Sequence, residues 1–191
     1  MNPANPTISM PHISTDSSTA PSPWVQRFGP QIAAGGSVLD LACGSGRHAR
    51  FLAGLGYRVE ALDRDQDALA ALDGVDNVVT RCADVEGGPW PYHARHFDGI
   101  VVTNYLHRPL LPLLINAVGE GGVLIYETFM IGNERFGKPS NPHFLLRPGE
   151  LLEIVRRRLH VVAFEEGEID APRPAVVQRL CAVRGATLKI G

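Results

Sequence analysis

Long apolar runs, paired cysteines and an excess of basic residues are all missing from this chain of 191 residues. No apolar run approaches the roughly 20 residues that a membrane-spanning helix requires, so we expect no contact with a membrane. The 3 cysteines are odd in number and far apart, which argues against a disulfide framework and against a Cys-x-x-Cys metal site. The formal net charge of −2 gives no general attraction to nucleic acid, although a local patch would still allow an RNA substrate.

The start of the chain differs in composition from the rest. Residues 1–21 are rich in Pro, Ser, Thr and Asn and poor in large apolar groups, so we predict a disordered or loosely held arm there. The length of residues 22–191 and the hydrophobic content of 45% suit a single globular domain. The sequence also lacks a basic segment followed by an apolar stretch, which would mark a secretory signal, and we therefore expect a cytoplasmic protein.

Apolar runs alternate with helical patterns from Ser37 onward. We expect helices at residues 47–55, 65–74, 109–118 and 148–159, and strands at residues 38–41, 57–62, 77–81, 97–102 and 122–129. This alternation predicts an α/β fold, a doubly wound parallel sheet with helices on both faces. Residues 160–168 and 175–183 predict a closing antiparallel hairpin. Residues 130–147 predict a long loop, of a length typical of lids and binding segments.

The most informative stretch is VLDLACGSGRHARFL, at residues 38–52. Gly44 and Gly46 lie between a predicted strand and a predicted helix, where glycine lets the backbone approach a ligand closely. In a doubly wound sheet this first turn lies at the cofactor crevice. Asp63 ends the second predicted strand, 19 residues after Gly44, and a carboxylate at that place can accept both hydroxyl groups of a ribose.

Asp40 helps to choose between two kinds of nucleoside cofactor. A dinucleotide would bring an anionic pyrophosphate to this loop, where the carboxylate would repel it. S-adenosylmethionine carries a sulfonium and an ammonium instead, which a nearby carboxylate attracts. The loop also lacks the third glycine of the dinucleotide fingerprint, because His48 and Ala49 occupy that region. These features favour a methyl donor over a nicotinamide cofactor, which remains the less favoured alternative.

Asp40 to Gly46 resembles motif I of the class I S-adenosylmethionine-dependent methyltransferases. The resemblance spans about residues 37–183 and implies a Rossmann-like sheet of seven strands in the order 3-2-1-4-5-7-6, with the last strand antiparallel. It implies that Asp84 contacts the adenine amino group and that Asn104 lies near the methionine part of the cofactor. Residues 56–65 and 127–153 are similar to the small TehB-like branch. The cofactor contacts that we expect are Asp40, Ala42, Cys43, Gly44, Gly46, Asp63, Arg64, Asp84, Val85 and Asn104.

The catalytic residues are less determined than the cofactor contacts. Methyl transfer needs alignment and exclusion of water, and an acceptor that is already nucleophilic needs no base. Candidates at the ends of the fourth and fifth strands are Tyr105, His107, Arg108 and Glu127. His107 is either a base or a residue that orders the loop. Arg108 either clamps an anionic acceptor or is solvated. Glu127 either contacts substrate or pairs with Arg147 or another cation of the loop.

The leading hypothesis is a small-molecule methyltransferase that uses S-adenosylmethionine and no metal. RNA or protein methylation is an alternative. The absence of the Asn-Pro-Pro-aromatic motif of many nucleic-acid enzymes after the fourth strand argues against it. A non-catalytic module that binds S-adenosylmethionine or S-adenosylhomocysteine is a third possibility. The sequence identifies neither the acceptor nor the oligomeric state.

Overall fold

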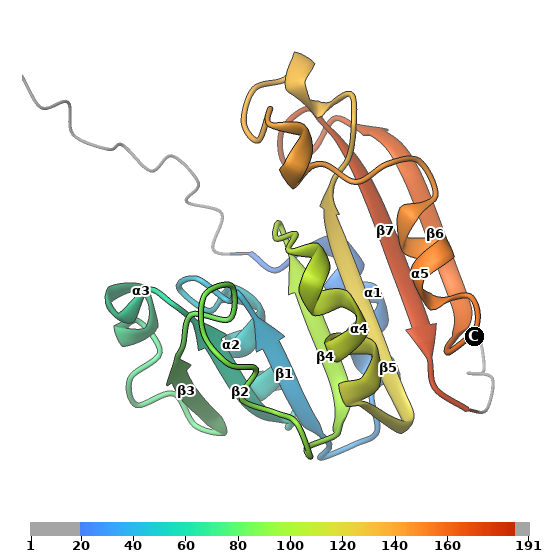
Figure 1. The fold of residues 1–191 in the computed structure, drawn as a ribbon. Coiled ribbons are helices and arrows are strands. Elements are labelled where there is room, and N and C mark those ends of the chain that lie inside the picture. The colour runs from blue at the N-terminus through green and yellow to red at the C-terminus, as the bar shows by residue number, and fades with distance from the viewer. Residues whose placement is uncertain (1–19, 186–191) are drawn as a thin grey trace, which may run out of the picture.

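The computed structural model describes residues 20–185, so the arm predicted at residues 1–21 lies outside it except for its last two residues. The fold is a seven-stranded sheet in the order β3-β2-β1-β4-β5-β7-β6 (Figure 1). All strands run parallel except β7, which pairs antiparallel with both β5 and β6. The strands are β1 (Ser37–Leu41), β2 (Arg58–Asp63), β3 (Val78–Cys82), β4 (Phe97–Thr103), β5 (Val118–Phe129), β6 (His160–Ile169) and β7 (Ala175–Val183). The predicted doubly wound order and the closing hairpin are confirmed.

The four predicted helices are all present, and each is shorter than predicted. The helices of the structure are α1 (Pro23–Phe28), α2 (Arg47–Gly54), α3 (Gln66–Ala70), α4 (Leu111–Ala117) and α5 (Glu150–Val155). The side chain of Asp65 caps α3 by accepting from the backbone N–H groups of Asp67 and Ala68. The helix predicted at residues 148–159 begins only at Glu150, because Gly149 before it has a left-handed φ of 68°, which is not helical.

Helices cover both faces of the sheet, as the alternation of apolar residues requires. One core lies under α1, α2 and α3 and includes Trp24, Leu52 and Leu69. The other core lies under α4 and α5 and includes Leu114 and Leu151. Figure 1 shows α4 and α5 on the near side of the sheet and α1 and α2 behind it. Burial of these two apolar layers is the main force that holds the fold together.

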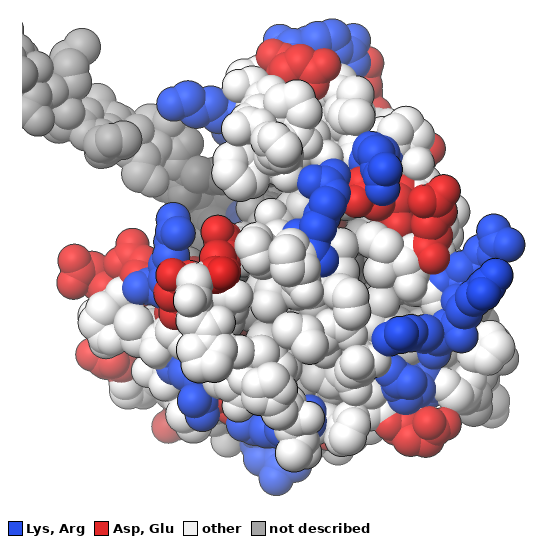
Figure 2. Space-filling model, viewed as in Figure 1, with Lys and Arg blue, Asp and Glu red and all other residues white. Residues whose placement is uncertain are grey.

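Residues 130–147 form the predicted long loop, which contains two short 3-10 turns, Asn133–Arg135 and Pro142–Phe144. The loop lies beyond the carboxyl end of β5, at the same edge to which the parallel strands point (Figure 1). Basic and acidic side chains occur in small groups over the face seen in Figure 2. Within residues 20–185, no helix has the length and hydropathy needed to cross a membrane.

Candidate functional site

A cleft of about 340 Å³ lies at the carboxyl edge of the sheet, where β1, β2, β3 and β4 end. Pro139 and Phe144 from the long loop form its outer wall. The side chains and backbone that line it from the sheet are Ala42, Leu62, Asp63, Arg64, Ala83, Asp84, Val85, Glu86, Asn104, Tyr105, Leu106, Thr128 and Phe129. Six of the ten residues expected to contact a cofactor therefore surround one cleft, namely Ala42, Asp63, Arg64, Asp84, Val85 and Asn104.

The loop after β1 fixes the carboxylate of Asp63 at the rim of this cleft. The backbone N–H of Gly44 donates to Oδ2 of Asp63 at 2.7 Å, and the N–H of Asp65 donates to Oδ1 at 3.0 Å. Each carboxylate oxygen keeps a further lone pair, because a carboxylate can accept about four hydrogen bonds. Asp63 is thus held rigidly while it can still accept from two hydroxyl groups of a ligand.

The two glycines of the loop differ in what surrounds them. A Cβ added to Gly44 would meet no atom within 4 Å, so open space lies in front of this residue. A Cβ on Gly46 would lie 2.4 Å from Cδ2 of Leu72, and Gly46 lines none of the cavities described here. Gly46 therefore lets α2 pack against the turn that follows α3, which differs from the ligand approach that its spacing suggested. Both glycines have the left-handed φ that favours glycine.

Asp40 is buried at the end of β1, with 1% of its surface exposed. In residues 20–185 neither of its carboxylate oxygens has a hydrogen-bond partner. Burial raises the pKa of Asp40 to about 7, an effect that the backbone amide of Ala49 and the nearby Arg47 offset in part. Asp40 does not itself line the cleft, so its charge is the means by which it would act on a ligand there. An unpartnered buried carboxylate under the loop suits a cationic ligand and disfavours an anionic pyrophosphate.

Asp84 lies at the exposed rim, where its Oδ1 accepts from the backbone N–H groups of Glu86 and Gly87. These two bonds lower the pKa of Asp84 and keep it ionised. Cys43 belongs to the same edge but is buried, and desolvation raises the pKa of its thiol, which makes the thiolate scarce. Cys43 thus fits a packing role beside the loop.

Asn104 stands where three hollows meet. It lines the main cleft, a second cavity of about 270 Å³, and a shallow hollow. The other residues of that hollow are Ala42, Cys43, Gly44, Ser45, Arg47, His48, Thr103 and Tyr105. The φ of Asn104, 54°, is left-handed, which is uncommon for a residue with a side chain and most tolerated by Asn, Asp and Gly. Such strain concentrates at functional sites, where the surrounding structure holds it in place.

The second cavity is built from segments that the sequence patterns did not connect with the site. Its walls come from the segment before and within α1, the turn between β6 and β7, and the end of β5. Its charged residues are Arg47, Arg173, Arg179 and Glu127, and Phe129 is shared with the main cleft. No motif marks these positions, because the topology alone brings β7 beside β5.

His48 is a further residue whose role sequence reasoning missed. It is 1% exposed, and its Nε2 accepts from the backbone N–H of Ser22 at 3.1 Å. Its Nδ1 therefore carries the proton and donates to Oγ1 of Thr103 at 3.2 Å. Burial lowers the pKa of His48 to about 3, so the ring stays neutral. His48 ties the start of α1 to the end of β4, directly before Asn104.

The candidate bases are held in other interactions. The hydroxyl of Tyr105 donates to Oε1 of Glu86 at 3.0 Å, and burial raises its pKa. Glu127 accepts from Nε of Arg179 at 2.5 Å, because these two residues lie opposite each other on β5 and β7. Its partner is thus a strand residue and neither Arg147 nor another loop cation. His107 starts the 3-10 turn before α4 and lines none of these hollows.

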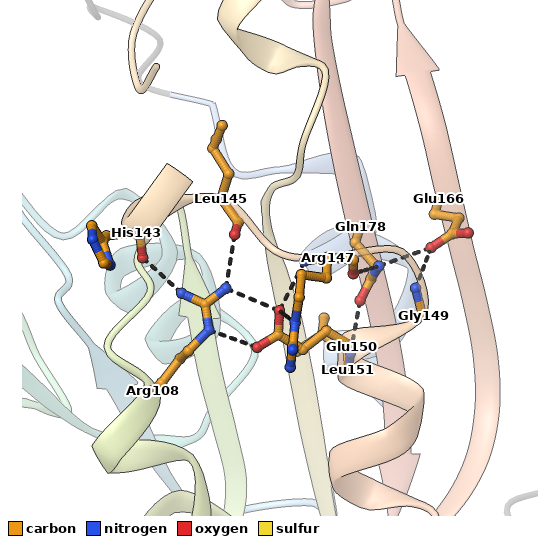
Figure 3. Close-up of polar contacts among 9 residues, drawn as sticks. All are labelled: Arg108, His143, Leu145, Arg147, Gly149, Glu150, Leu151, Glu166 and Gln178. Carbon is orange, nitrogen blue, oxygen red and sulfur yellow. Dashed lines mark hydrogen bonds and ion pairs between the residues drawn. The ribbon is translucent and has the colours of Figure 1, made fainter. Parts of the chain in front are cut away.

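Arg108, in the 3-10 turn before α4, connects the long loop with the start of α5 (Figure 3). Its Nε and one terminal nitrogen donate to the two carboxylate oxygens of Glu150 at 2.7 and 3.0 Å. The terminal nitrogens also donate to the carbonyl oxygens of His143 and Leu145, both at 2.8 Å. Glu150 is 3% exposed, so this bidentate pair is well shielded from solvent. The guanidinium is therefore occupied, in contrast to both the clamp and the solvated residue expected from the sequence.

Comparison with known proteins agrees with this geometry. Residues 38–118 match the family model of a methyltransferase domain. A protein-L-isoaspartate O-methyltransferase of Chlorobaculum tepidum is 38% identical over 105 residues, which cover 52% of this chain and 48% of that protein. Residues 38–118 are therefore similar to methyltransferase domains. The chain spans about half the length of this curated relative, and the residues that match the family model include the β1–α2 loop and Asp63.

Two solved methyltransferase structures extend the likeness of the fold over most of this chain. TehB from Haemophilus influenzae superposes with a TM-score of 0.68 and 21% identity, covering 85% of this chain and 61% of that one. A TehB-like S-adenosylmethionine-dependent methyltransferase from Corynebacterium glutamicum superposes with a TM-score of 0.62 and 18% identity, covering 85% and 87%. Within residues 20–185, no group of three or more His, Cys, Asp or Glu is arranged to hold a metal ion.

Proposed function

We propose that this methyltransferase domain binds S-adenosylmethionine in the main cleft and methylates a small molecule held in the second cavity. The observation that carries the proposal is the junction at Asn104, which lines both spaces. A transferase for small substrates needs a donor site and an acceptor site that meet at one point. Phe129 is shared as well, so the two sites adjoin along one wall.

The residues present suit the parts of this cofactor. Asp63 would accept from the ribose hydroxyls, and Asp84 with Val85 would hold the adenine. The open backbone at Gly44 and the hollow beside Asn104 would take the methionine part. When bound, the cofactor would supply a methyl group on a cationic sulfur: an electron pair of the acceptor forms the new bond to the methyl carbon while the carbon–sulfur bond breaks, and its electrons stay on the sulfur.

The protein's own contribution is to position the acceptor and exclude water. His48, Tyr105 and Glu127 each line a hollow together with Asn104, and each is engaged in a hydrogen bond or ion pair within the protein. An acceptor atom that is already nucleophilic, such as a thiolate, therefore fits this site best, because it requires no base. The loop anchored by Arg108 places Pro139 and Phe144 over the cleft.

Calorimetry with S-adenosylmethionine, S-adenosylhomocysteine and NAD tests the donor site. We expect both sulfur nucleosides to bind, and Asp63→Ala to weaken them by about tenfold to a hundredfold, since a hydrogen bond to a charged group contributes roughly 1.5–3 kcal/mol. The exposed Asp76 provides a matched control, and Asp76→Ala should leave binding unchanged. Binding of NAD alone would refute the proposal, and unchanged affinity in Asp63→Ala would mean that the ribose lies elsewhere.

A protein acceptor is the second candidate, favoured by the curated relative that is named a protein-L-isoaspartate O-methyltransferase. Methyl transfer should therefore be measured on thiols, phenols, tellurite and selenite, short RNA and an isoaspartyl peptide. We expect turnover on a small molecule. Turnover on the peptide alone would favour the second candidate, and cofactor binding without turnover on any of these would favour a binding module.

A further inference from the structure

We infer that the second cavity selects an acceptor that carries an anionic group, which Arg173 recognises. The inference deepens the proposed function and rests on it only in calling the bound molecule an acceptor. Three arginines and one glutamate line the cavity, so its polar lining carries an excess of positive charge. An excess of one sign in a concave site favours ligands of the opposite sign.

The four charged groups are not equivalent. Arg179 is committed to Glu127 at 2.5 Å and lies 3.6 Å from Glu165. By contrast, neither Arg47 nor Arg173 makes an ion pair or a side-chain hydrogen bond with any other residue between 20 and 185. Both guanidinium groups therefore line the second cavity with their donors available, but Arg47 also lines the shallow hollow assigned to the methionine part of the cofactor, and of the two only Arg173 serves the second cavity alone. A carboxylate or another oxyanion is the group that such donors bind best.

Arg173 is held at the boundary with the donor site. Its guanidinium carbon lies 5.7 Å from the centre of the Phe129 ring, a cation–π arrangement that orients the side chain without using its donors. Phe129 lines the main cleft as well as the second cavity. An anion on Arg173 would thus be placed within one small molecule's length of the junction at Asn104.

Apolar residues complete the walls. Ile169, Ala175 and Val177 line the cavity beside Phe129 and belong to a small apolar cluster of their own. A volume of about 270 Å³ is near the lower end of the range for small-molecule pockets. The lining therefore fits a compact organic acid with an apolar body, and it disfavours a neutral or cationic acceptor.

Matched probes that differ only in charge test this inference. 4-Mercaptobenzoate and 4-mercaptobenzamide are titrated by calorimetry into the protein, both alone and saturated with S-adenosylhomocysteine. We expect the carboxylate to bind about tenfold to a hundredfold more tightly than the amide, as a charge-assisted hydrogen bond implies. Arg173→Gln should remove this preference, Arg173→Lys should retain part of it, and neither should change affinity for S-adenosylhomocysteine by more than about twofold.

Arg156→Gln is the control, because Arg156 is an exposed arginine at the end of α5 that does not line the cavity. Equal binding of the two probes, binding of neither, or a preference that survives Arg173→Gln would each overturn the inference. Failure of the protein to bind S-adenosylhomocysteine would instead contradict the proposed function, and the probe titrations without that nucleoside would still decide the charge preference.

Discussion

The backbone N–H of Asn104 donates to the carbonyl oxygen of Glu127 at 2.9 Å. This bond joins the end of β4 to β5 at the point where the donor cleft and the second cavity meet. It also holds Asn104 in its left-handed conformation, while the side chain of Glu127 pairs with Arg179 on the next strand. One short stretch of backbone thus connects the predicted donor site with the cavity that we assign to the acceptor.

The strain at Asn104 predicts a difference between two substitutions. Asn104→Gly keeps a residue that adopts φ of 54° without cost, whereas Asn104→Ala should lower the free energy of unfolding by about 1 kcal/mol more, because alanine disfavours that region. Thermal or denaturant unfolding of both variants measures this difference. Equal stability of the two variants would show that the backbone relaxes and that no strain is held here.

The two loop glycines predict opposite consequences for the same substitution. Gly44→Ala should cost only about 1 kcal/mol of stability but weaken S-adenosylhomocysteine binding, because its Cβ would point into space that a ligand needs. Gly46→Ala should cost several kcal/mol, because its Cβ would overlap Leu72. Unfolding and calorimetry are measured on both variants. The assignment fails if Gly46→Ala is as stable as Gly44→Ala.

His48 predicts a loss of stability in acid. The pKa of His48 is about 3 in the folded protein and 6.5 in the unfolded chain. Between pH 6.5 and 3 the unfolded chain therefore binds a proton at this residue and the folded protein does not. Stability from His48 is therefore present above pH 6.5 and falls by at most about 1.4 kcal/mol for each pH unit down to pH 3.

Asp40 acts in the opposite direction over almost the same range. Its pKa rises from 3.8 to about 7 on folding, so its contribution is most favourable below pH 3.8 and is lost as pH rises to 7. The two effects offset each other between about pH 4 and 6.5. We expect the free energy of unfolding of Asp40→Asn to fall more steeply than that of the parent as pH decreases below 6.5. We expect the free energy of unfolding of His48→Gln to rise over the same range. Parallel pH profiles of both variants and the parent would contradict this balance.

Arg108 predicts a local rather than a global effect. Arg108→Gln would remove bonds to two loop carbonyls and leave the buried Glu150 with Arg147 alone. We expect the free energy of unfolding to fall by about 2 kcal/mol, because breaking the ion pair leaves the buried carboxylate of Glu150 partly uncompensated. Hydrogen exchange should rise between residues 139 and 146 while β1 and β4 stay protected. Unchanged exchange in that loop would mean that its own packing holds it.

Sequence patterns predicted the sheet well because each strand carries its own signal. The alternation of apolar runs with capped helices predicts strands and helices locally, whereas the strand order 3-2-1-4-5-7-6 was implied by the resemblance to class I S-adenosylmethionine-dependent methyltransferases. The cap at Asp65 is likewise local, since it is set by the turn that contains it. Asp63 is held partly by that turn and partly by the N–H of Gly44, 19 positions away.

The interactions that were not predicted join residues far apart in the chain. Arg108 meets Glu150 across 42 positions, and Glu127 meets Arg179 across 52. No sequence motif marks either pair, because nothing in the sequence around an arginine or a glutamate indicates which distant partner it will meet in the fold. His48 and the second cavity were missed for the same reason: their partners, Ser22, Thr103 and Arg173, become neighbours only after the sheet is complete.

The second cavity draws on both ends of the described chain, and this bears on how the protein is made. Its walls combine residues 20–23 with residues 171–179, and Trp24 donates to the carbonyl oxygen of Leu180. The ribosome releases the early segment before the late one, so the early segment must wait until β7 has been made. The nascent protein can form its β1–α2 loop long before the second cavity can close, and the acceptor selection that we infer requires β7 to be in place.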